Sequence, residues 1–123
     1  MTKIFLVSQT EEENHLLKRK VEPLMRGGEA LAFVGVRPQL LPQSVDKDVS
    51  IVVLNSNIFN EVFHQAIVET RKVGYRGPIL VLSKADSLEA RTILRSLENV
   101  FFLEKPYQIR DLIGLMRKVL FEY

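Results

Sequence analysis

Five short apolar runs, separated by longer amphipathic segments, dominate the pattern of hydrophobic and polar positions along the chain. None of these runs alternates regularly between apolar and polar residues, which is typical of parallel strands that are covered on both faces. The pattern therefore predicts strands at Lys3–Ser8, Ala30–Val34, Ser50–Leu54, Ile79–Leu82 and Val100–Leu103.

The segments between the runs predict helices. Thr10 and Glu13 form a capping box, in which each side chain satisfies the backbone amide of the other residue, so a helix is expected over Glu11–Met25. Further helices are expected over Asn60–Val73, from the similar start at Asp86 and Glu89 to Glu98, and over Gln108–Phe121. The side chains expected to face inward are Leu16, Leu17, Val21, Leu24, Val62, Phe63, Ala66, Ile67, Thr70, Leu112, Met116, Val119 and Leu120.

Glycine and proline mark the ends of these elements. Gly27 and Gly28 are expected to end the first helix, since glycine is favoured directly after a helix. Two prolines, Pro38 and Pro42, lie within Arg37–Asp48, where only a loop or one short helical turn is expected.

The order of elements is strand, helix, strand, short helix, strand, helix, strand, helix, strand, helix. Because parallel strands are joined by right-handed crossovers, this order favours an α/β fold with a doubly wound, five-stranded parallel sheet. We expect the flavodoxin-like strand order 2-1-3-4-5, with a second helix that is short or irregular. A length of 123 residues fits one domain, residues 1–123.

The composition excludes several classes of protein. With 17 basic and 15 acidic residues, the net charge of +2 is too balanced to predict nucleic-acid binding by this domain. The chain has no cysteine, so disulfides and thiolate chemistry are excluded. No apolar run approaches the roughly 20 residues of a membrane-spanning helix, so no membrane association and a cytoplasmic location are expected.

Polar residues follow four of the expected strands. They are Ser8 with Gln9, then Asn55, Ser83, and Lys105 with Pro106. The carboxyl ends of parallel strands meet at one edge of a sheet, which is where α/β proteins place their functional residues. These side chains are therefore expected to lie together.

This ordered set of strand ends resembles the receiver domain of bacterial response regulators over essentially the whole chain. In that family, two acids after the first strand bind magnesium, and an aspartate after the third accepts a phosphoryl group. Ser8, Gln9 and Asn55 stand at those three positions. Ser83 matches the family's hydroxyl residue, and Lys105-Pro106 matches its lysine–proline pair, for which the resemblance implies a cis peptide bond.

Three departures from the family pattern affect the phosphoryl-transfer chemistry directly. Ser8, Gln9 and Asn55 offer only neutral oxygens, which cannot offset the dehydration of Mg²⁺. An amide is also a far poorer nucleophile than a carboxylate. We therefore expect a vestigial pocket at Ser8, Gln9, Asn55, Ser83 and Lys105, with no metal, no cofactor and no catalysis. Lys105 is expected to bond Asn55 or backbone oxygens, or to reach Glu11 or Glu12.

The resemblance also implies a binding surface. Receivers commonly dimerise or bind target proteins through the fourth helix, the fifth strand and the last helix, so a protein partner or a homodimer is expected there. The residues assigned to this surface are Arg91, Arg95, Phe102, Leu115 and Arg117. Phe102 matches the family's switch aromatic, three residues before the lysine. For Leu115 two interpretations remain open, extra core or part of the partner surface.

Three functions remain in competition. The first is a phosphorylation-independent signalling module that acts by binding proteins. The second is a flavodoxin-like domain that binds a nucleotide or a flavin, against which stand the three negative charges of Glu11, Glu12 and Glu13 after the first strand. The third is a phosphoacceptor that uses a different residue.

Overall fold

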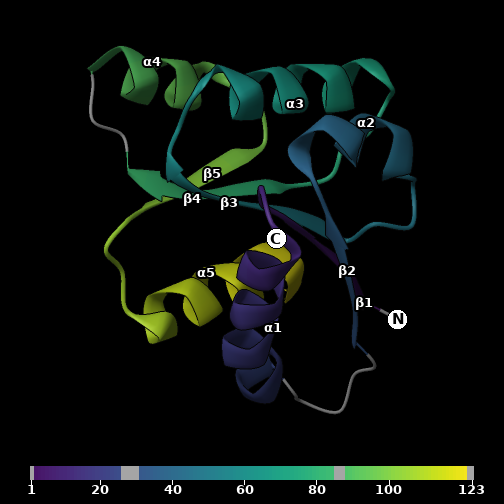
Figure 1. The fold of residues 1–123 in the computed structure, drawn as a ribbon, viewed down its shortest axis with the longest axis vertical. Coiled ribbons are helices and arrows are strands. Elements are labelled where there is room, and N and C mark those ends of the chain that lie inside the picture. The colour runs from purple at the N-terminus through teal and green to yellow at the C-terminus, as the bar shows by residue number, and fades with distance from the viewer. Residues whose placement is uncertain (1, 26–30, 85–87, 122–123) are drawn as a thin grey trace.

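The computed structural model describes residues 2–25, 31–84 and 88–121, which form a single five-stranded sheet with helices on both faces (Figure 1). The elements are β1 (Thr2–Val7), α1 (Glu11–Met25), β2 (Leu31–Val36), the 3₁₀ turn η1 (Pro38–Leu40), α2 (Leu41–Ser44), β3 (Ile51–Ile58), α3 (Glu61–Lys72), β4 (Ile79–Lys84), α4 (Leu88–Ser96), β5 (Val100–Glu104) and α5 (Ile109–Phe121).

The strand order is β2-β1-β3-β4-β5, and all four pairings are parallel. This confirms the predicted doubly wound sheet and its order. The second helix is a single turn after η1, as the prolines predicted, with Pro38 and Pro42 each within the first two positions of their helical turns.

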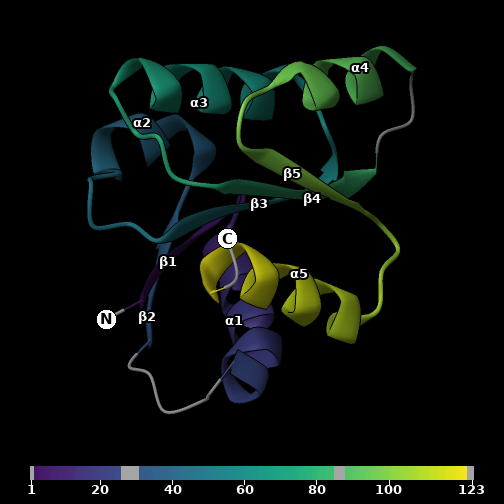
Figure 2. The same cartoon turned by 180° about the vertical axis from the view of Figure 1, so that it is seen from behind.

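Two hydrophobic layers hold the helices to the sheet. On one face α2, α3 and α4 pack against the strands, with Phe63, Ile67 and Leu94 among the buried side chains. On the other face lie α1 and α5, with Val21, Leu112 and Met116 buried. Figures 1 and 2 show the two layers from opposite sides. The central strands β3 and β4 are apolar on both faces because both faces are covered.

Three predictions about inward-facing residues were wrong. Leu16 and Leu24 on α1 are 50% and 46% exposed, and Val62 on α3 is 39% exposed. The stripe of α1 that faces the sheet instead includes Asn14 and Met25. Asn14 is polar, but it is tolerated in this layer because its amide is hydrogen-bonded, which hydrophobicity alone does not reveal.

Four strands run beyond the ends that were predicted for them. β2 reaches Val36 rather than Val34, and β5 reaches Glu104 rather than Leu103. β3 continues to Ile58 rather than ending at Leu54, and β4 continues to Lys84 rather than Leu82. Pairing resumes past an irregularity, because Asn55 aligns with Leu82 and Ile58 with Lys84. Three steps along β3 thus match two along β4, which is the mark of a β-bulge.

The start of α1 shows one of the two hydrogen bonds of the predicted capping box, since the Glu13 amide donates to Thr10 Oγ1 at 3.1 Å. The predicted helix stop at Gly27-Gly28 and the predicted cap at Asp86 lie outside the described residues. None of the helices in the described ranges is long and apolar enough to cross a membrane.

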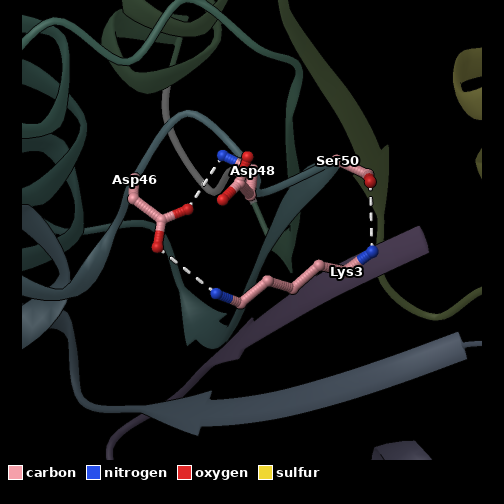
Figure 3. Close-up of polar contacts among 4 residues, drawn as sticks. All are labelled: Lys3, Asp46, Asp48 and Ser50. Carbon is pink, nitrogen blue, oxygen red and sulfur yellow. Dashed lines mark hydrogen bonds and ion pairs between the residues drawn. The ribbon is translucent and has the colours of Figure 1, made fainter. Parts of the chain in front are cut away.

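At the amino edge of the sheet, Lys3 ties β1 to the connection between α2 and β3 (Figure 3). Its Nζ lies 3.3 Å from Asp46 Oδ2, and its backbone amide donates to Ser50 Oγ at 3.0 Å. The Asp48 amide donates to the other Asp46 oxygen at 2.8 Å and, with Lys3, lowers the pKa of Asp46. The Asp46 side chain is half exposed, so these contacts fix the loop geometry more than they add stability.

Arg71, at the end of α3, makes the densest set of polar contacts at this same edge. Its guanidinium donates to the carbonyl oxygens of Tyr75 (2.8 Å), Gly77 (2.7 Å), Glu98 (3.0 Å) and Asn99 (3.2 Å). One side chain therefore joins the α3–β4 connection to the α4–β5 connection.

Candidate functional site

The polar strand ends meet at the carboxyl edge of the sheet, as predicted. The register places them side by side, because Val7 aligns with Leu54, Asn55 with Leu82 and Ser83 with Glu104. Ser8 and Lys105 directly follow β1 and β5. The Lys105–Pro106 peptide bond is cis, as the resemblance implied.

Lys105 and Asn55 form the central contact of this edge. Lys105 Nζ donates to Asn55 Oδ1 at 2.6 Å, which confirms the first of the partners expected for this lysine. Burial lowers the pKa of Lys105, the positive charge of Lys20 lowers it further, and Glu13 partly opposes both. Glu13, not Glu11 or Glu12, is thus the acid that acts on this ammonium group.

Ser8 is fully buried and its hydroxyl is already engaged. Its Oγ lies 2.8 Å from the Thr10 carbonyl oxygen and 2.9 Å from Asn14 Oδ1. Asn14 Nδ2 in turn reaches the Val36 carbonyl at 3.5 Å, so the amide bridges the ends of β1 and β2. Sequence reasoning missed Asn14, although its place three residues before Leu17 puts it on the buried stripe of α1.

The remaining two predicted pocket residues behave differently from each other. Gln9 is exposed. Ser83 is completely buried, and its hydroxyl has no hydrogen-bond partner among the described residues. The next residue, Lys84, is exposed.

A hollow of about 670 Å³ opens at this edge between α1, the strand ends and the start of α5. Its polar lining comes from Glu13, Lys20, Asn55, Asn57, Lys84 and Lys105. Its apolar lining comes mainly from Leu16, Pro106, Tyr107 and Ile109. Of the five predicted pocket residues, only Asn55 and Lys105 line it. Sequence reasoning did not place Lys20 or Asn57 here.

These residues do not fit the magnesium ion that the fold implies. The Ser8 hydroxyl is buried and engaged, and Asn55 Oδ1 accepts from an ammonium group. Three lysines line the hollow, where Mg²⁺ needs oxygen ligands and negative charge. Elsewhere in the described ranges, no group of three or more His, Asp or Glu residues could hold a metal ion.

The residues assigned to the second surface lie on α4, β5 and α5. Arg91 Nη2 on α4 pairs with Glu104 Oε2 at the end of β5 at 2.7 Å, while Arg95 is exposed. Phe102 is half-buried against the core layer of α3 and α4. On α5, the side chain of Leu115 is half-buried and packs against the opposite layer.

Arg117 lies on the α1 side of α5. Its guanidinium donates to the Leu24 carbonyl at the end of α1, at 2.7 Å. This contact helps to hold the two helices together on their face of the sheet.

No protein-family model matches the sequence, and a search of curated proteins finds no match. Many solved structures share the fold. The receiver domain of Francisella response regulator 1452 matches with a TM-score of 0.71 and 17% identity, over 98% of this chain and 97% of the other. Chemotaxis protein CheY4 of Vibrio cholerae matches with a TM-score of 0.70 and 15% identity, over 98% and 99%.

A protein of Burkholderia thailandensis assigned to pilus assembly, cpaE, matches with a TM-score of 0.74 and 16% identity, over 97% and 98% of the two chains. Two of these three structures are a receiver domain and a chemotaxis protein, and all agree with the chain over nearly its whole length. At such low identities the likeness concerns the fold. The chain has the five-stranded, flavodoxin-like fold of response-regulator receiver domains.

Proposed function

We propose that this chain is a phosphorylation-independent signalling module of the receiver type, which acts in the cytoplasm by binding proteins and performs no catalysis. The fold likeness supports a receiver-type module, and the residues at the carboxyl edge support independence from phosphorylation. The proposal treats residues 1–123 as one receiver-like domain.

The observation that carries the proposal is the 2.6 Å contact between Lys105 Nζ and Asn55 Oδ1. The lysine already has a neutral oxygen partner at the position where a phosphoryl acceptor would be needed. Because the amide is a poor nucleophile and Ser8 is buried and engaged, nothing at this edge favours an acyl phosphate. The binding surface is then set by its side chains and not by a phosphoryl group.

Phosphoryl transfer is the direct test. The chain is incubated with acetyl phosphate and Mg²⁺, and its intact mass is measured. We expect no added phosphate, either in the wild type or in Asn55→Asp, since the metal ligands are absent in both. A magnesium-dependent adduct on the wild type would overturn the proposal and favour a phosphoacceptor at another residue.

The proposed partner surface consists of α4, β5 and α5, with Arg91, Arg95, Phe102 and Leu115 as its residues. β5 is an edge strand of the sheet, so this surface is accessible from the side. Its exposed charges would fix the orientation of a contact, and its half-buried apolar groups would form the centre. Arg117 is directed to α1, so its contribution would be indirect.

Arg95→Glu tests this surface, because Arg95 is exposed and forms no hydrogen bond or ion pair with another described residue. We expect reduced self-association in sedimentation equilibrium, or reduced binding to a partner once one is identified, with unchanged thermal unfolding. Arg19→Glu on the exposed side of α1 carries the same charge change and serves as the control. Equal behaviour of the two variants would place the interface elsewhere.

A further inference from the structure

The hollow at the carboxyl edge carries an excess of positive charge that the proposed function does not use. Lys20, Lys84 and Lys105 line it, and Glu13 is the acid that lines it with them. Three cations and one carboxylate leave two net positive charges in one concave surface. In the sequence, the neighbouring glutamates counted against phosphate binding. In the structure Glu11 and Glu13 line different hollows, because Glu11 lines one beside β2.

Hydrogen-bond donors accompany this charge. An ammonium group carries three protons, and Lys105 uses one for Asn55. Within the described ranges, no hydrogen bond or ion pair engages the ammonium groups of Lys20 and Lys84. Asn55 and Asn57 add side-chain amides. An anion with several oxygens is the chemistry that such a set of donors would bind.

The electrostatics of Lys105 point the same way. Burial lowers the pKa of Lys105, and the like charge of Lys20 adds to this effect, while Glu13 opposes it. An anion in the hollow would act in the same direction as Glu13 and favour the charged form of the lysine.

The apolar part of the lining indicates what the anion is attached to. Leu16 is 50% exposed beside the hollow, and Tyr107 and Ile109 adjoin it at the start of α5. Its volume of about 670 Å³ lies within the roughly 300–1,000 Å³ of small-molecule pockets. A bare inorganic ion would leave this apolar surface unused.

We propose that the hollow binds a small phosphate monoester non-covalently, with the phosphate held by Lys20, Lys84 and Lys105 and an apolar or aromatic body lying on Leu16, Tyr107 and Ile109. No bond is formed or broken in this step. The site therefore differs from a phosphoacceptor, which forms a covalent bond to phosphate. Two of its three lysines also lie outside the set of residues that the family resemblance assigns.

The test is a titration of the full chain at fixed ionic strength, monitored by the amide signals in NMR spectra. The probes are phenyl phosphate, inorganic phosphate and phenol. We expect saturable chemical-shift changes with phenyl phosphate and no saturable binding of phenol. Inorganic phosphate should bind about tenfold more weakly than phenyl phosphate, because it lacks the apolar area that the ring would bury. Equal affinities for phenyl phosphate and inorganic phosphate would overturn the assignment of the apolar lining. An absence of saturable binding by phenyl phosphate would overturn the whole proposal.

Charge variants separate the site from general attraction. Lys20→Gln and Lys84→Gln are each expected to lower the affinity for phenyl phosphate about fivefold, and Glu13→Gln is expected to raise it by a similar factor. Each estimate follows from removing one unit charge near the protein surface. Glutamine is also accepted at the Glu13 position of a capping box, so the start of α1 is retained. Lys47→Gln removes an exposed lysine elsewhere and should change the affinity less than twofold.

If Lys47→Gln weakens binding as much as the hollow variants do, the titration reports an adventitious ion only and the proposal is overturned. Intact mass after the titration should remain that of the unmodified chain. A covalent phosphate adduct would contradict both this proposal and the phosphorylation independence proposed above, whereas failure of binding without an adduct contradicts this proposal alone.

Discussion

Replacing Asn55 by aspartate tests how the carboxyl edge is held together. In the wild type, Lys105 Nζ donates to the neutral Oδ1 of Asn55 at 2.6 Å. The variant Asn55→Asp puts a carboxylate of nearly the same shape at this point. The ammonium group of Lys105 then gains a charged partner in place of an amide, while the packing around it is kept.

The expected gain follows from this distance and from the partial burial of both groups. Two unit charges about 3 Å apart attract by about 1.4 kcal/mol in bulk water and about 5 kcal/mol at an effective dielectric constant of 20. Desolvation of the introduced carboxylate opposes this attraction, and both side chains are only half-buried. We therefore expect the free energy of unfolding to rise by about 1–2 kcal/mol at pH 7.

The gain should depend on pH with a definite sign. Lys105 and the nearby Lys20 and Lys84 would hold the folded-state pKa of the introduced carboxyl group below its unfolded value of about 3.9. The extra stability is then present above about pH 5 and is lost as the pH falls through the folded-state pKa.

Urea unfolding at pH 7 and at pH 3 measures both parts of this prediction. Gln43→Glu is the matched control, since it makes the same change from amide to carboxylate at an exposed position on α2, away from the hollow, and should alter stability by less than about 0.5 kcal/mol. A loss of stability in Asn55→Asp at pH 7, or a gain that persists unchanged at pH 3, would refute the electrostatic reasoning.

Three further predictions concern the opposite edge and the backbone. Arg71→Met should lower the free energy of unfolding by about 3 kcal/mol, because four carbonyl oxygens lose a charged donor, and Arg71→Lys should lose less; urea unfolding compares them. Burial raises the pKa of Tyr75 to about 12, so the folded state keeps a proton that the unfolded state loses above pH 10. Stability should accordingly fall by about 1.4 kcal/mol between pH 9 and pH 11, and Tyr75→Phe should remove this part of the fall. Gly74 has a φ of 102°, so Gly74→Ala should cost about 1–2 kcal/mol, whereas Gly114→Ala within α5 should stabilise by about 0.5–1 kcal/mol; the reverse order in thermal unfolding would contradict the backbone argument.

The hydrophobic pattern was sufficient to predict the sheet. The runs that form β1, β3 and β4 are nearly uninterrupted, because those strands are covered on both faces, and proline at positions 38 and 42 predicted the short second helix. The pattern failed on α1, where Leu16 was expected inside and Asn14 is buried instead. Burial of an amide depends on partners from other elements, here Ser8 and the Val36 carbonyl, and these are not visible in the local sequence.

The candidate site was predictable only in part for the same reason. Asn55 and Lys105 could be paired because both directly follow strands whose order was predicted. Lys20 lies two turns into α1, and its presence at the hollow depends on how that helix lies across the strand ends. The contacts of Arg71 are to backbone carbonyls, which leave no mark in the sequence at the partner positions.

The Arg71 contacts have a consequence for where the molecule opens. The carbonyl oxygens of Gly77 and Asn99 accept from one guanidinium that joins α3, β4 and β5, so exchange of the amide hydrogens in these connections should require these elements to separate together. Among the described residues of the carboxyl edge, smaller sets of contacts join the strand ends: Lys105 donates to Asn55, and Asn14 links Ser8 to the Val36 carbonyl. We therefore expect local fluctuations to be larger at the edge with the hollow, so that its residues can rearrange around a partner or a ligand while the opposite edge keeps the sheet intact.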